Sequence, residues 1–566
     1  MVPYLRKSSL IRYYITSFFC AYIFIFQSCS SSKEHSKHAM VVSAHPLASK
    51  VGLEILKQGG NAVDAAVAVQ FALAVVYPSA GNIGGGGFFV YRSNQGELAS
   101  LDFREKAPNK SYRDMYLDSA GNVIENLSLK GHLASGVPGT VDGMVEIHDS
   151  LGRLKWETLL QPAIDLANNG FMLTSKEAEK LTFFTKYKVI DSTYNPYYKI
   201  NYSEGDTLFL PDLAQTLEAI RDFKRDGFYS GAVADKIVKE MKNNHGLISY
   251  DDLSNYASVW RDPVVFPYKD YNIISMGPPS SGGIALAQMM NMTSNFEMKD
   301  FEFHSENAVH LLCEIEKRAF ADRSAYLGDP DFYNIPVESL MNTSYLNSRM
   351  DDFKINMATS DDSLHPGDFD FLESDETTHF SIVDEDGNAV SITTTLNGSF
   401  GSGVMVKNGG FLLNNEMDDF SIKPGYPNLY GLIGGEANAI SPNKRMLSSM
   451  TPTIVEKNDS LHMVLGSPGG SSIITAVFQT ILNVIEYKMD IQTAVNAPRF
   501  HHQWKPDYIK MEDDFKNDDS LILSLQKKGH EVRFVSSMNR VDAILVKLDS
   551  LYAGADKRGD DYAASY

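Results

Sequence analysis

A pair of threonines carries the first chemical signal in this sequence. Thr377 and Thr378 follow residues 361–376, which are rich in Asp and Glu and predict an exposed, mobile linker. A turn signal centred on Asp386 predicts a β-hairpin whose register places Thr395 opposite Thr377, with both side chains on one face. Paired hydroxyls of this kind are candidates for nucleophilic chemistry. An edge strand rich in threonine for its β propensity also explains the pattern.

A second signal is the stretch Leu412–Ser421, in which acidic and amide side chains crowd together, among them Glu416 and Asp419. The spacing lacks the alternating oxygen ligands and the central glycine of a calcium loop. A pocket for an ammonium group and a solvated turn are the two readings that remain.

A third signal is Gly466–Gly470, which lies directly before an apolar helix predicted at Ile473–Ile485. Free backbone N–H groups at the positive end of a helix dipole suit an oxyanion. Pro468 occupies the centre of this loop, so it is not the Gly-x-Ser-x-Gly elbow of other hydrolases. The adjacent His501 and His502 point apart on a strand, and no zinc site is predicted.

The elements that must position these residues are predicted to be helices in the first part of the chain and strands further along it. Pro46 starts a helix that ends at Gly60, and Asn61 caps a second, all-apolar helix at Ala62–Val76. A glycine-rich loop then leads into a strand at Phe88–Arg92 without the Gly-Lys-Ser/Thr of a phosphate loop.

The remaining segments complete this pattern. Residues 140–350 read as mostly helical, whereas His462–Leu465 is a short strand that enters the glycine loop. Strands and helices in this order indicate a layered α/β sandwich.

Composition excludes several classes of protein. The 566 residues carry a net charge of −20, and Lys and Arg do not cluster beyond the N-terminus, so nucleic acid is not an expected partner. The cysteines are Cys20, Cys29 and Cys313. Only the last belongs to the folded body, which therefore has no internal disulfide and no cysteine metal site.

The N-terminus reads as an export signal. Basic residues precede a short apolar run over 14–26, and Ser28-Cys29 is followed by a serine-rich tether. This pattern resembles a bacterial lipoprotein signal, in which residues 1–28 are removed and Cys29 is lipidated, anchoring the exported protein to a membrane. An uncleaved signal anchor with an incidental cysteine is the alternative.

Many separate motifs, in order, resemble the γ-glutamyltranspeptidase family of N-terminal nucleophile hydrolases. The resemblance begins near residue 38 and runs through nearly all of the chain that follows. It is carried by Ser43–Ser49, Gly59–Ala66, Asn82–Phe88, Leu101–Pro108, Gly136–Gly139, Pro278–Gly283, Thr377–His379, Asn414–Phe420, Ser448–Thr453 and Pro468–Gly470.

The resemblance implies an α/β fold, a four-layer αββα sandwich built from two self-cleaved subunits. The chain cuts itself between Glu376 and Thr377. A tether at 29–40 then precedes a large subunit at 41–376, and Thr377 becomes the N-terminus of a small catalytic subunit at 377–566. The two subunits form a heterodimer within one catalytic domain. The resemblance implies no cofactor and no metal.

The resemblance also implies the role of each site residue. Thr377 attacks the γ-carbonyl of glutathione or a related donor, with its own α-amine as base, and passes the acyl group to water, amino acids or dipeptides. Thr395 hydrogen-bonds Thr377. The other implied residues are Gly469 and Gly470 for the oxyanion, Arg104, Ser448 and Ser449 for the donor carboxylate, and Asn397, Glu416 and Asp419 for its ammonium group.

The segment 424–438 resembles a lid loop that closes over the pocket through Tyr430, although an ordinary glycine-rich loop has the same composition. Two other functions stay open. One is an acylase of the same fold that acts on glutaryl amides and needs no counter-charge of the Asp419 type. The other is an inactive exported binding lipoprotein.

Overall fold

The computed structural model describes residues 35–187, 197, 201–360 and 377–566. The predicted signal segment, Cys29, the acidic linker and Glu376 lie outside these described residues. Within the described part of the chain, no helix is both long and apolar enough to cross a membrane.

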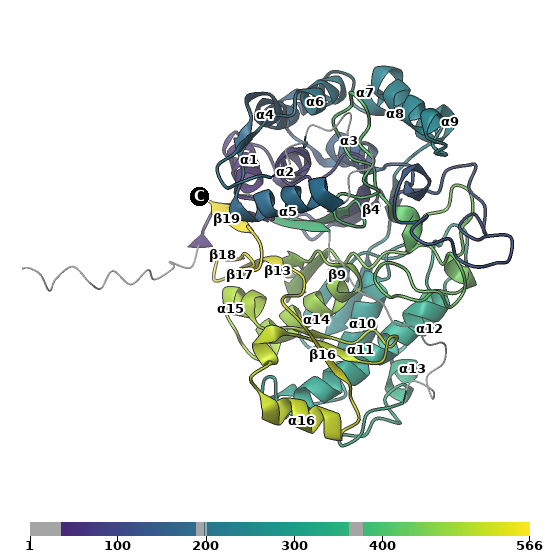
Figure 1. Ribbon diagram of the computed structural model, residues 1–566. Helices are drawn as coiled ribbons and strands as arrows, with labels where there is room; N and C mark the ends of the chain where they lie inside the picture. Colours follow the sequence, from purple (N-terminus) through teal and green to yellow (C-terminus); the bar gives the residue numbers. More distant parts are fainter. Residues whose placement is uncertain (1–34, 188–196, 198–200, 361–376) are drawn as a thin grey trace, which may run out of the picture. The chain divides into compact units, whose positions relative to one another are not determined.

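Two seven-stranded antiparallel sheets form the centre of the described residues (Figure 1). The first sheet has the order β1 (His35–Ser36), β18 (Ser550–Gly554), β17 (Asp542–Lys547), β13 (Ser460–Gly466), β12 (Thr453–Lys457), β9 (Tyr271–Ser275) and β8 (Val264–Tyr268). The second has the order β19 (Tyr562–Ser565), β2 (Met40–Ser43), β10 (Thr378–Val383), β11 (Ala389–Thr395), β3 (Gly86–Arg92), β4 (Leu98–Asp102) and β7 (Val259–Arg261).

The two sheets pack face to face through one apolar layer, in which Val42 and Val90 of one sheet meet Val464 and Ile544 of the other. Both sheets contain strands from before and from after residue 377, and in each sheet strands of the two segments pair with one another. The segments on either side of the predicted cut are therefore built into one another rather than into separate domains.

Helices α1 (Pro46–Lys57) and α2 (Ala62–Val76) cover the outer face of the second sheet. The predicted cap is confirmed, because Asn61 and Asp64 form a reciprocal capping box. Every residue of α2 is buried, as its apolar sequence indicated. Phe380 and Ile392 point from the sheet into this helical layer.

Helices α10 (Gly282–Thr293), α11 (Glu306–Tyr326) and α14 (Ile473–Ile485) cover the outer face of the first sheet. Their apolar side chains pack with Ile273 and Leu465 of that sheet. The order helix, sheet, sheet, helix is the expected αββα sandwich.

The other elements lie around these layers. Figure 1 shows α3 to α9 near the second sheet and α12, α13 and α16 near the first. The helices are α3 (Thr140–Leu151), α4 (Trp156–Asn169), α5 (Ser175–Tyr187), α6 (Pro211–Phe223), α7 (Asp226–Tyr229), α8 (Gly231–Asn243), α9 (Tyr250–Ser254), α12 (Val337–Leu340), α13 (Thr343–Ser348), α15 (Ile491–Asn496) and α16 (Asp519–Lys527). The small sheets pair β5 (Phe171–Met172) with β6 (Thr207–Leu208), and β14 (Phe500–His501) with β15 (Ile509–Glu512) and β16 (Val532–Val535).

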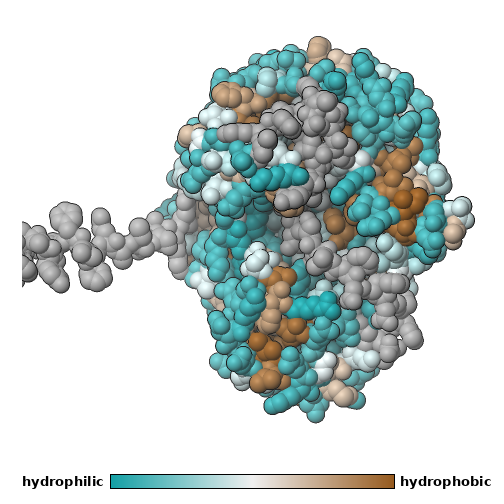
Figure 2. Space-filling model, in the orientation of Figure 1, coloured by the Kyte–Doolittle hydropathy of each residue, from teal (hydrophilic) through white to brown (hydrophobic). Residues whose placement is uncertain are grey.

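The region 140–350 is mostly helical, as predicted, but it also contains the strands β5 to β9. The β8–β9 hairpin was not predicted, although β8 alternates buried and exposed residues in the manner of an edge strand. Figure 2 shows hydrophilic residues over most of the visible face, interrupted by separate hydrophobic patches.

Candidate active site

Thr377 lies directly before β10, at the end of the hairpin that β10 forms with β11. The pairing of Thr378 with Thr394 continues the register centred on Asp386, so the predicted register is confirmed. The hydroxyl oxygens of Thr377 and Thr395 lie 3.4 Å apart, and both residues are buried. The Thr395 hydroxyl also accepts a hydrogen bond of 2.8 Å from the backbone N–H of Asn397.

His379 is the imidazole nearest to Thr377 along this strand, and its contacts are structural. Its Nδ1 lies 2.9 Å from the Thr393 hydroxyl and its Nε2 lies 3.1 Å from the Ser381 hydroxyl. Complete burial lowers the pKa of His379 to about 3. The ring is neutral at physiological pH, and both nitrogens are occupied by hydroxyl groups.

A cavity of about 20 Å³, called here the inner cavity, opens beside Thr377. This volume has room for about one water molecule. Most of the residues that were predicted to form the site line it: Arg104, Thr377, Thr395, Asn397, Glu416, Asp419, Tyr430, Ser448, Ser449 and Gly470, together with Leu432, Met450 and Ile473. Gly469 is adjacent in sequence but is not part of the lining.

The charged wall of the inner cavity is centred on Arg104, which is almost completely buried. Its Nη1 lies 2.9 Å from Glu416 Oε2, and its Nη2 lies 2.5 Å from Asp419 Oδ2. Burial raises the pKa values of Glu416 and Asp419, and the positive charge of Arg104 opposes that rise. The groups expected to bind opposite charges of a donor thus bind one another in the structure.

Glu105 lies behind this wall and was not predicted as a site residue. Its Oε2 is 3.6 Å from Arg104 Nη1, which is too far for a hydrogen bond. Burial raises the pKa of Glu105 to about 8, so the carboxyl group is largely protonated at neutral pH.

Arg323, on α11, is a second buried guanidinium that sequence analysis did not find. Its Nε donates to the Ser281 hydroxyl at 2.9 Å, and its Nη2 donates to the Ser449 hydroxyl at 3.1 Å. The Ser281 hydroxyl in turn donates to the backbone oxygen of Ser448 at 2.6 Å. Arg323 therefore supports both serines that were predicted to bind the donor carboxylate.

The glycine pair lies at the start of a short 3-10 helix (Gly470–Ser472), which leads into α14. Gly469 and Gly470 have φ values of +118° and +57°, and a Cβ on Gly470 would lie 2.2 Å from the Tyr430 ring. Only glycine therefore fits at residue 470 without displacing Tyr430. Tyr430 is buried over the cavity, and its hydroxyl donates a hydrogen bond of 2.7 Å to the backbone oxygen of Asn397.

The carboxylates of the acidic stretch point in two different directions. Glu416–Asp419 forms a short 3-10 helix, in which Glu416 and Asp419 lie on one face because the helix has three residues per turn. Asp418 points elsewhere: it accepts hydrogen bonds from the Ser128 hydroxyl at 2.6 Å and from the Leu429 N–H at 2.7 Å. Asp418 thereby holds the loop that carries Tyr430.

One cluster among the described residues has the spacing of a metal site: His310, Glu314 and His530. Its ligand atoms are already engaged. Glu314 pairs with Arg318 at 2.6 Å, and the two imidazoles contact each other at 2.7 Å through Nδ1 of His310 and Nε2 of His530. None of the three lines the inner cavity, and we assign no metal to them.

Comparison with known proteins identifies the family. Residues 48–566 match the family model described as Gamma-glutamyltranspeptidase. The chain belongs to the gamma-glutamyltranspeptidase family. The glutathione hydrolase proenzyme of Escherichia coli (strain K12) is 47% identical over 538 residues, which cover 94% of this chain and 92% of that protein. The glutathione hydrolase proenzyme of Pseudomonas sp. (strain A14) is 45% identical and covers 95% of this chain and 93% of that protein.

Solved structures agree with this membership of the gamma-glutamyltranspeptidase family. A cephalosporin acylase from Bacillus halodurans superposes with a TM-score of 0.84 at 27% identity, covering 94% of this chain and 96% of that chain. The gamma-glutamyltranspeptidase of Helicobacter pylori gives a TM-score of 0.56 at 45% identity, covering 57% of this chain and 94% of that chain. The fold is that of the N-terminal nucleophile hydrolases, as the sequence motifs implied.

Proposed function

We propose that this protein is a self-processing γ-glutamyltransferase and glutathione hydrolase with an N-terminal threonine nucleophile. The observation that carries the proposal is the position of Thr377, directly before β10, beside Thr395 and at a cavity lined by paired buried charges. The similarity to two bacterial glutathione hydrolase proenzymes over nearly the whole chain supports it.

In the proposed reaction, the α-amine of Thr377 accepts the proton of the Thr377 hydroxyl, whose oxygen attacks the γ-carbonyl carbon of the donor. The backbone N–H groups of Gly469 and Gly470 stabilise the resulting oxyanion. The amide C–N bond then breaks, and the leaving amine takes the proton from the α-ammonium group. The γ-glutamyl ester of Thr377 remains, and water or an acceptor amine attacks its carbonyl carbon and releases the threonine oxygen.

Donor recognition follows from the charged wall. Arg104, Ser448 and Ser449 bind the α-carboxylate, and Asn397, Glu416 and Asp419 bind the α-ammonium group. Arg104 forms ion pairs with Glu416 and Asp419, and these pairs keep the buried charges compensated in the empty site. When a donor binds, its own charges take the place of these partners. A donor that carries both a carboxylate and an ammonium group pairs with both kinds of charged side chain in the wall. A donor that carries only one of these charges leaves a buried side chain of the wall without an opposite charge.

Maturation is proposed as a cut between Glu376 and Thr377, which yields a large subunit at 41–376 and a small subunit at 377–566. Because both sheets contain strands of both segments, paired with one another, we expect the two subunits to stay associated after the cut. Denaturing gels of purified protein should show two fragments, the smaller beginning Thr-Thr-His. Thr377→Ala should leave one uncut chain. A wild-type chain that stays whole and fully active contradicts the proposal.

We propose that the protein is exported as a lipoprotein. Residues 1–28 would be removed, Cys29 would be lipidated, and residues 29–40 would form a tether. The apolar run followed by a small residue, a cysteine and serines supports it. Cys29→Ala should abolish labelling by a fatty-acid probe and release the protein from membranes. Unchanged labelling would show that the signal is of another type.

Incubation of the pure protein with glutathione, with and without a dipeptide acceptor, tests the function. We expect glutamate and cysteinylglycine in water, an additional γ-glutamyl dipeptide with the acceptor, and neither reaction with Thr377→Ala. If glutathione binds without turnover, the protein is instead an inactive binding lipoprotein.

A glutaryl acylase is the second candidate, favoured by the similarity to the cephalosporin acylase. A glutaryl anilide, which lacks the α-ammonium group, separates the two. We expect it to react far more slowly than the γ-glutamyl anilide, because Glu416 and Asp419 have no cation to bind on a glutaryl group. A faster glutaryl reaction would establish the acylase.

A further inference from the structure

The two peptide units that carry the proposed oxyanion donors are both bonded to the side chain of Asn539. Its Nδ2 donates to the Pro468 backbone oxygen at 2.7 Å and to the Gly469 backbone oxygen at 3.2 Å. The Pro468 oxygen and the Gly469 N–H belong to one peptide unit, and the Gly469 oxygen and the Gly470 N–H belong to the next. Asn539 therefore contacts the carbonyl end of each unit whose N–H end is proposed to bind the oxyanion.

The planarity of the peptide bond links these contacts to the direction of the N–H groups. In a trans peptide unit, the C=O and N–H bonds point in opposite directions. Because one side chain holds both carbonyl oxygens, both N–H groups point away from that side chain. Neither N–H donates a hydrogen bond to another residue that the structure describes. Gly470 lines the inner cavity together with Thr377, so both groups are available at the wall of the cavity that holds the nucleophile.

The orientation of the Asn539 amide follows from its partners. Both partners are carbonyl oxygens, which only accept hydrogen bonds, so the NH₂ group and not the amide oxygen must face them. The contact is close, because a Cβ on Gly469 would lie 2.2 Å from Asn539 Nδ2. Glycine is therefore needed at residue 469 both for its φ of +118° and for the side chain that packs against it.

Two serines of the same loop bind the same oxygens. The Ser467 hydroxyl donates to the Pro468 oxygen at 2.7 Å, and the Ser472 hydroxyl donates to the Gly469 oxygen at 3.0 Å. Because these serines belong to the loop, they move with it and do not fix its orientation in the molecule. Asn539 comes from a distant segment and holds both peptide units to it.

That segment is the connection between β16 and β17, and buried charged side chains hold it in place. The Met538 N–H donates to Glu512 Oε1 at 2.7 Å, and the Met538 backbone oxygen accepts from Arg499 Nη1 at 3.0 Å. Glu512 and Arg499 are both buried. Asn539 itself has a φ of +57°, in the left-handed region that asparagine adopts more readily than most residues. The amide is thus in position before any donor binds.

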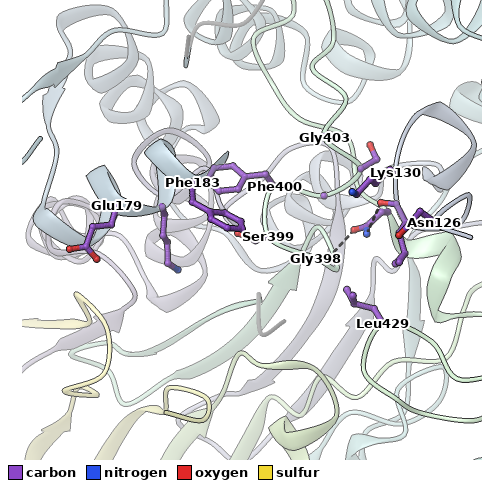
Figure 3. A pocket seen from close by; sticks show the side chains of 14 residues that line it. Asn126, Lys130, Glu179, Phe183, Gly398, Ser399, Phe400, Gly403 and Leu429 are labelled. Atoms are coloured by element: carbon purple, nitrogen blue, oxygen red, sulfur yellow. Dashed lines mark hydrogen bonds between the residues drawn. The ribbon is translucent and has the colours of Figure 1, made fainter. Parts of the chain in front are cut away.

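Asn539 lies outside the space that a substrate can occupy beside Thr377. It lines neither the inner cavity nor the larger cavity of about 540 Å³ whose side chains Figure 3 shows, among them Phe183 and Leu429. A substrate in either cavity therefore does not touch Asn539. Any effect of this side chain on the reaction must pass through Pro468–Gly470.

We propose that Asn539 is a positioning residue, which holds the Gly469 and Gly470 N–H groups in the direction that stabilises the oxyanion. The inference rests on the proposed hydrolase function and adds a residue that lies outside all the family motifs. Negative charge develops on the carbonyl oxygen only during the reaction, so the direction of these donors should affect turnover more than donor binding. A hydrogen bond to each carbonyl oxygen also polarises its peptide unit and strengthens the N–H as a donor.

The test removes the amide of Asn539 while keeping its backbone conformation. Asn539→Gly retains the left-handed φ, and Asn539→Asp retains the shape but replaces the NH₂ group with an oxygen. Asn458→Gly is the matched control, because Asn458 has a φ of +49° and is exposed in the turn between β12 and β13. Thermal unfolding shows that each variant is folded, and denaturing gels give the amount of cut small subunit to which kcat is referred.

Hydrolysis of γ-glutamyl-p-nitroanilide is the first measurement. We expect both Asn539 variants to lower kcat about tenfold with little change in KM, a fraction of the roughly 10²–10³-fold that follows loss of a whole oxyanion donor. The control should match wild type. An unchanged kcat in the correctly cut Asn539 variants overturns the proposal.

Inhibition separates positioning of the N–H groups from general damage to the pocket. The glutamate analogue with a boronic acid in place of its γ-carboxyl group forms a tetrahedral adduct with the Thr377 hydroxyl, whereas glutamate binds without an adduct. The inhibition constant of the boronate should rise about as much as kcat falls, and that of glutamate should stay within about twofold of wild type.

The remaining outcomes are distinct. Equal weakening of the boronate and of glutamate overturns the proposal, because misdirected N–H groups do not explain a loss with glutamate. A folded Asn539 variant that stays uncut also overturns it and places this side chain in maturation instead of turnover. A wild type that fails to hydrolyse the anilide removes the proposed function itself, whatever the variants do.

Discussion

Nη2 of Arg104 lies 2.5 Å from Oδ2 of Asp419, in a cavity wall where both side chains are largely buried. The resemblance to the family implied that Arg104 binds the carboxylate of a donor and Asp419 its ammonium group, and the structure joins these two side chains directly. Asp419 also accepts a hydrogen bond of 2.9 Å from the Asn428 side chain. The pair therefore links the charged wall to the loop that carries Tyr430.

Breaking this pair should weaken donor binding without stopping maturation. Arg104→Ala or Asp419→Ala leaves a buried charge without its partner, and we expect a loss of roughly 2–5 kcal/mol in kcat/KM for a γ-glutamyl anilide. Much of the loss should appear in KM, because these groups are proposed to bind the part of the donor that does not react. Steady-state kinetics beside a denaturing gel measure both effects. Normal hydrolysis by both correctly cut variants would show that the pocket is misassigned.

Arg323 should act on the donor only through the serines it supports. Arg323→Gln removes a charged donor to the Ser449 hydroxyl, which is worth about 1.5–3 kcal/mol, and should raise KM more than it lowers kcat. Arg323→Lys keeps one charge and should recover part of the loss. A γ-aminobutyryl anilide lacks the α-carboxylate, so its slower hydrolysis should respond little to either variant. Equal losses with both anilides would indicate a structural role alone.

Local signals in the sequence predicted parts of the fold and the pairing of Thr377 with Thr395, whereas the donor-binding roles were implied by the resemblance to the family. The Asn61 cap, the helix at Ile473–Ile485 and the register centred on Asp386 each depend on residues close together in the chain. Thr395 could be placed opposite Thr377 because a hairpin register is fixed by its turn.

The undetected features depend on contacts between distant segments. Arg323 reaches Ser449 from a helix more than a hundred residues earlier, and nothing in either segment specifies that meeting. The separate role of Asp418 follows from a 3-10 helix, a conformation that no local pattern indicated. The protonated state of Glu105 follows from burial, which only the packed structure determines.

The contact between Tyr430 and Gly470 should control closure of the inner cavity. Gly470→Ala places a methyl group 2.2 Å from the Tyr430 ring at a backbone φ of +57°, so it should displace Tyr430 and disturb the loop that is proposed to bind the oxyanion. Tyr430→Phe keeps the ring and removes the hydroxyl that donates to the Asn397 backbone oxygen, a hydrogen bond worth about 1 kcal/mol, and should raise KM about fivefold. Kinetics with the anilide distinguish the two: Gly470→Ala should lower kcat strongly, whereas Tyr430→Phe should not. An unaffected KM in Tyr430→Phe argues against a closing role.

Glu105 should make the stability of the protein depend on pH in a defined direction. Its pKa of about 8 in the folded chain lies above the ordinary value of 4.5, so between these values the folded chain holds a proton that the unfolded chain has released. Stability from this group is therefore fully present below pH 4.5 and is lost as pH rises towards 8, at up to about 1.4 kcal/mol per pH unit. Glutamine carries no proton, so Glu105→Gln should remove this dependence.

Thermal unfolding between pH 5 and 8.5 measures the pH dependence of stability that is expected from Glu105. The midpoint of wild type should fall with pH relative to that of Glu105→Gln, so that the variant gains stability over wild type towards pH 8. Glu302→Gln changes an exposed carboxylate and provides the control, whose midpoint should follow that of wild type. Parallel profiles for wild type and Glu105→Gln would mean that Glu105 is ionised when buried. Three carboxylates would then surround the guanidinium group of Arg104. Removal of the Glu105 charge should in that case strengthen the pairing of Arg104 with Asp419.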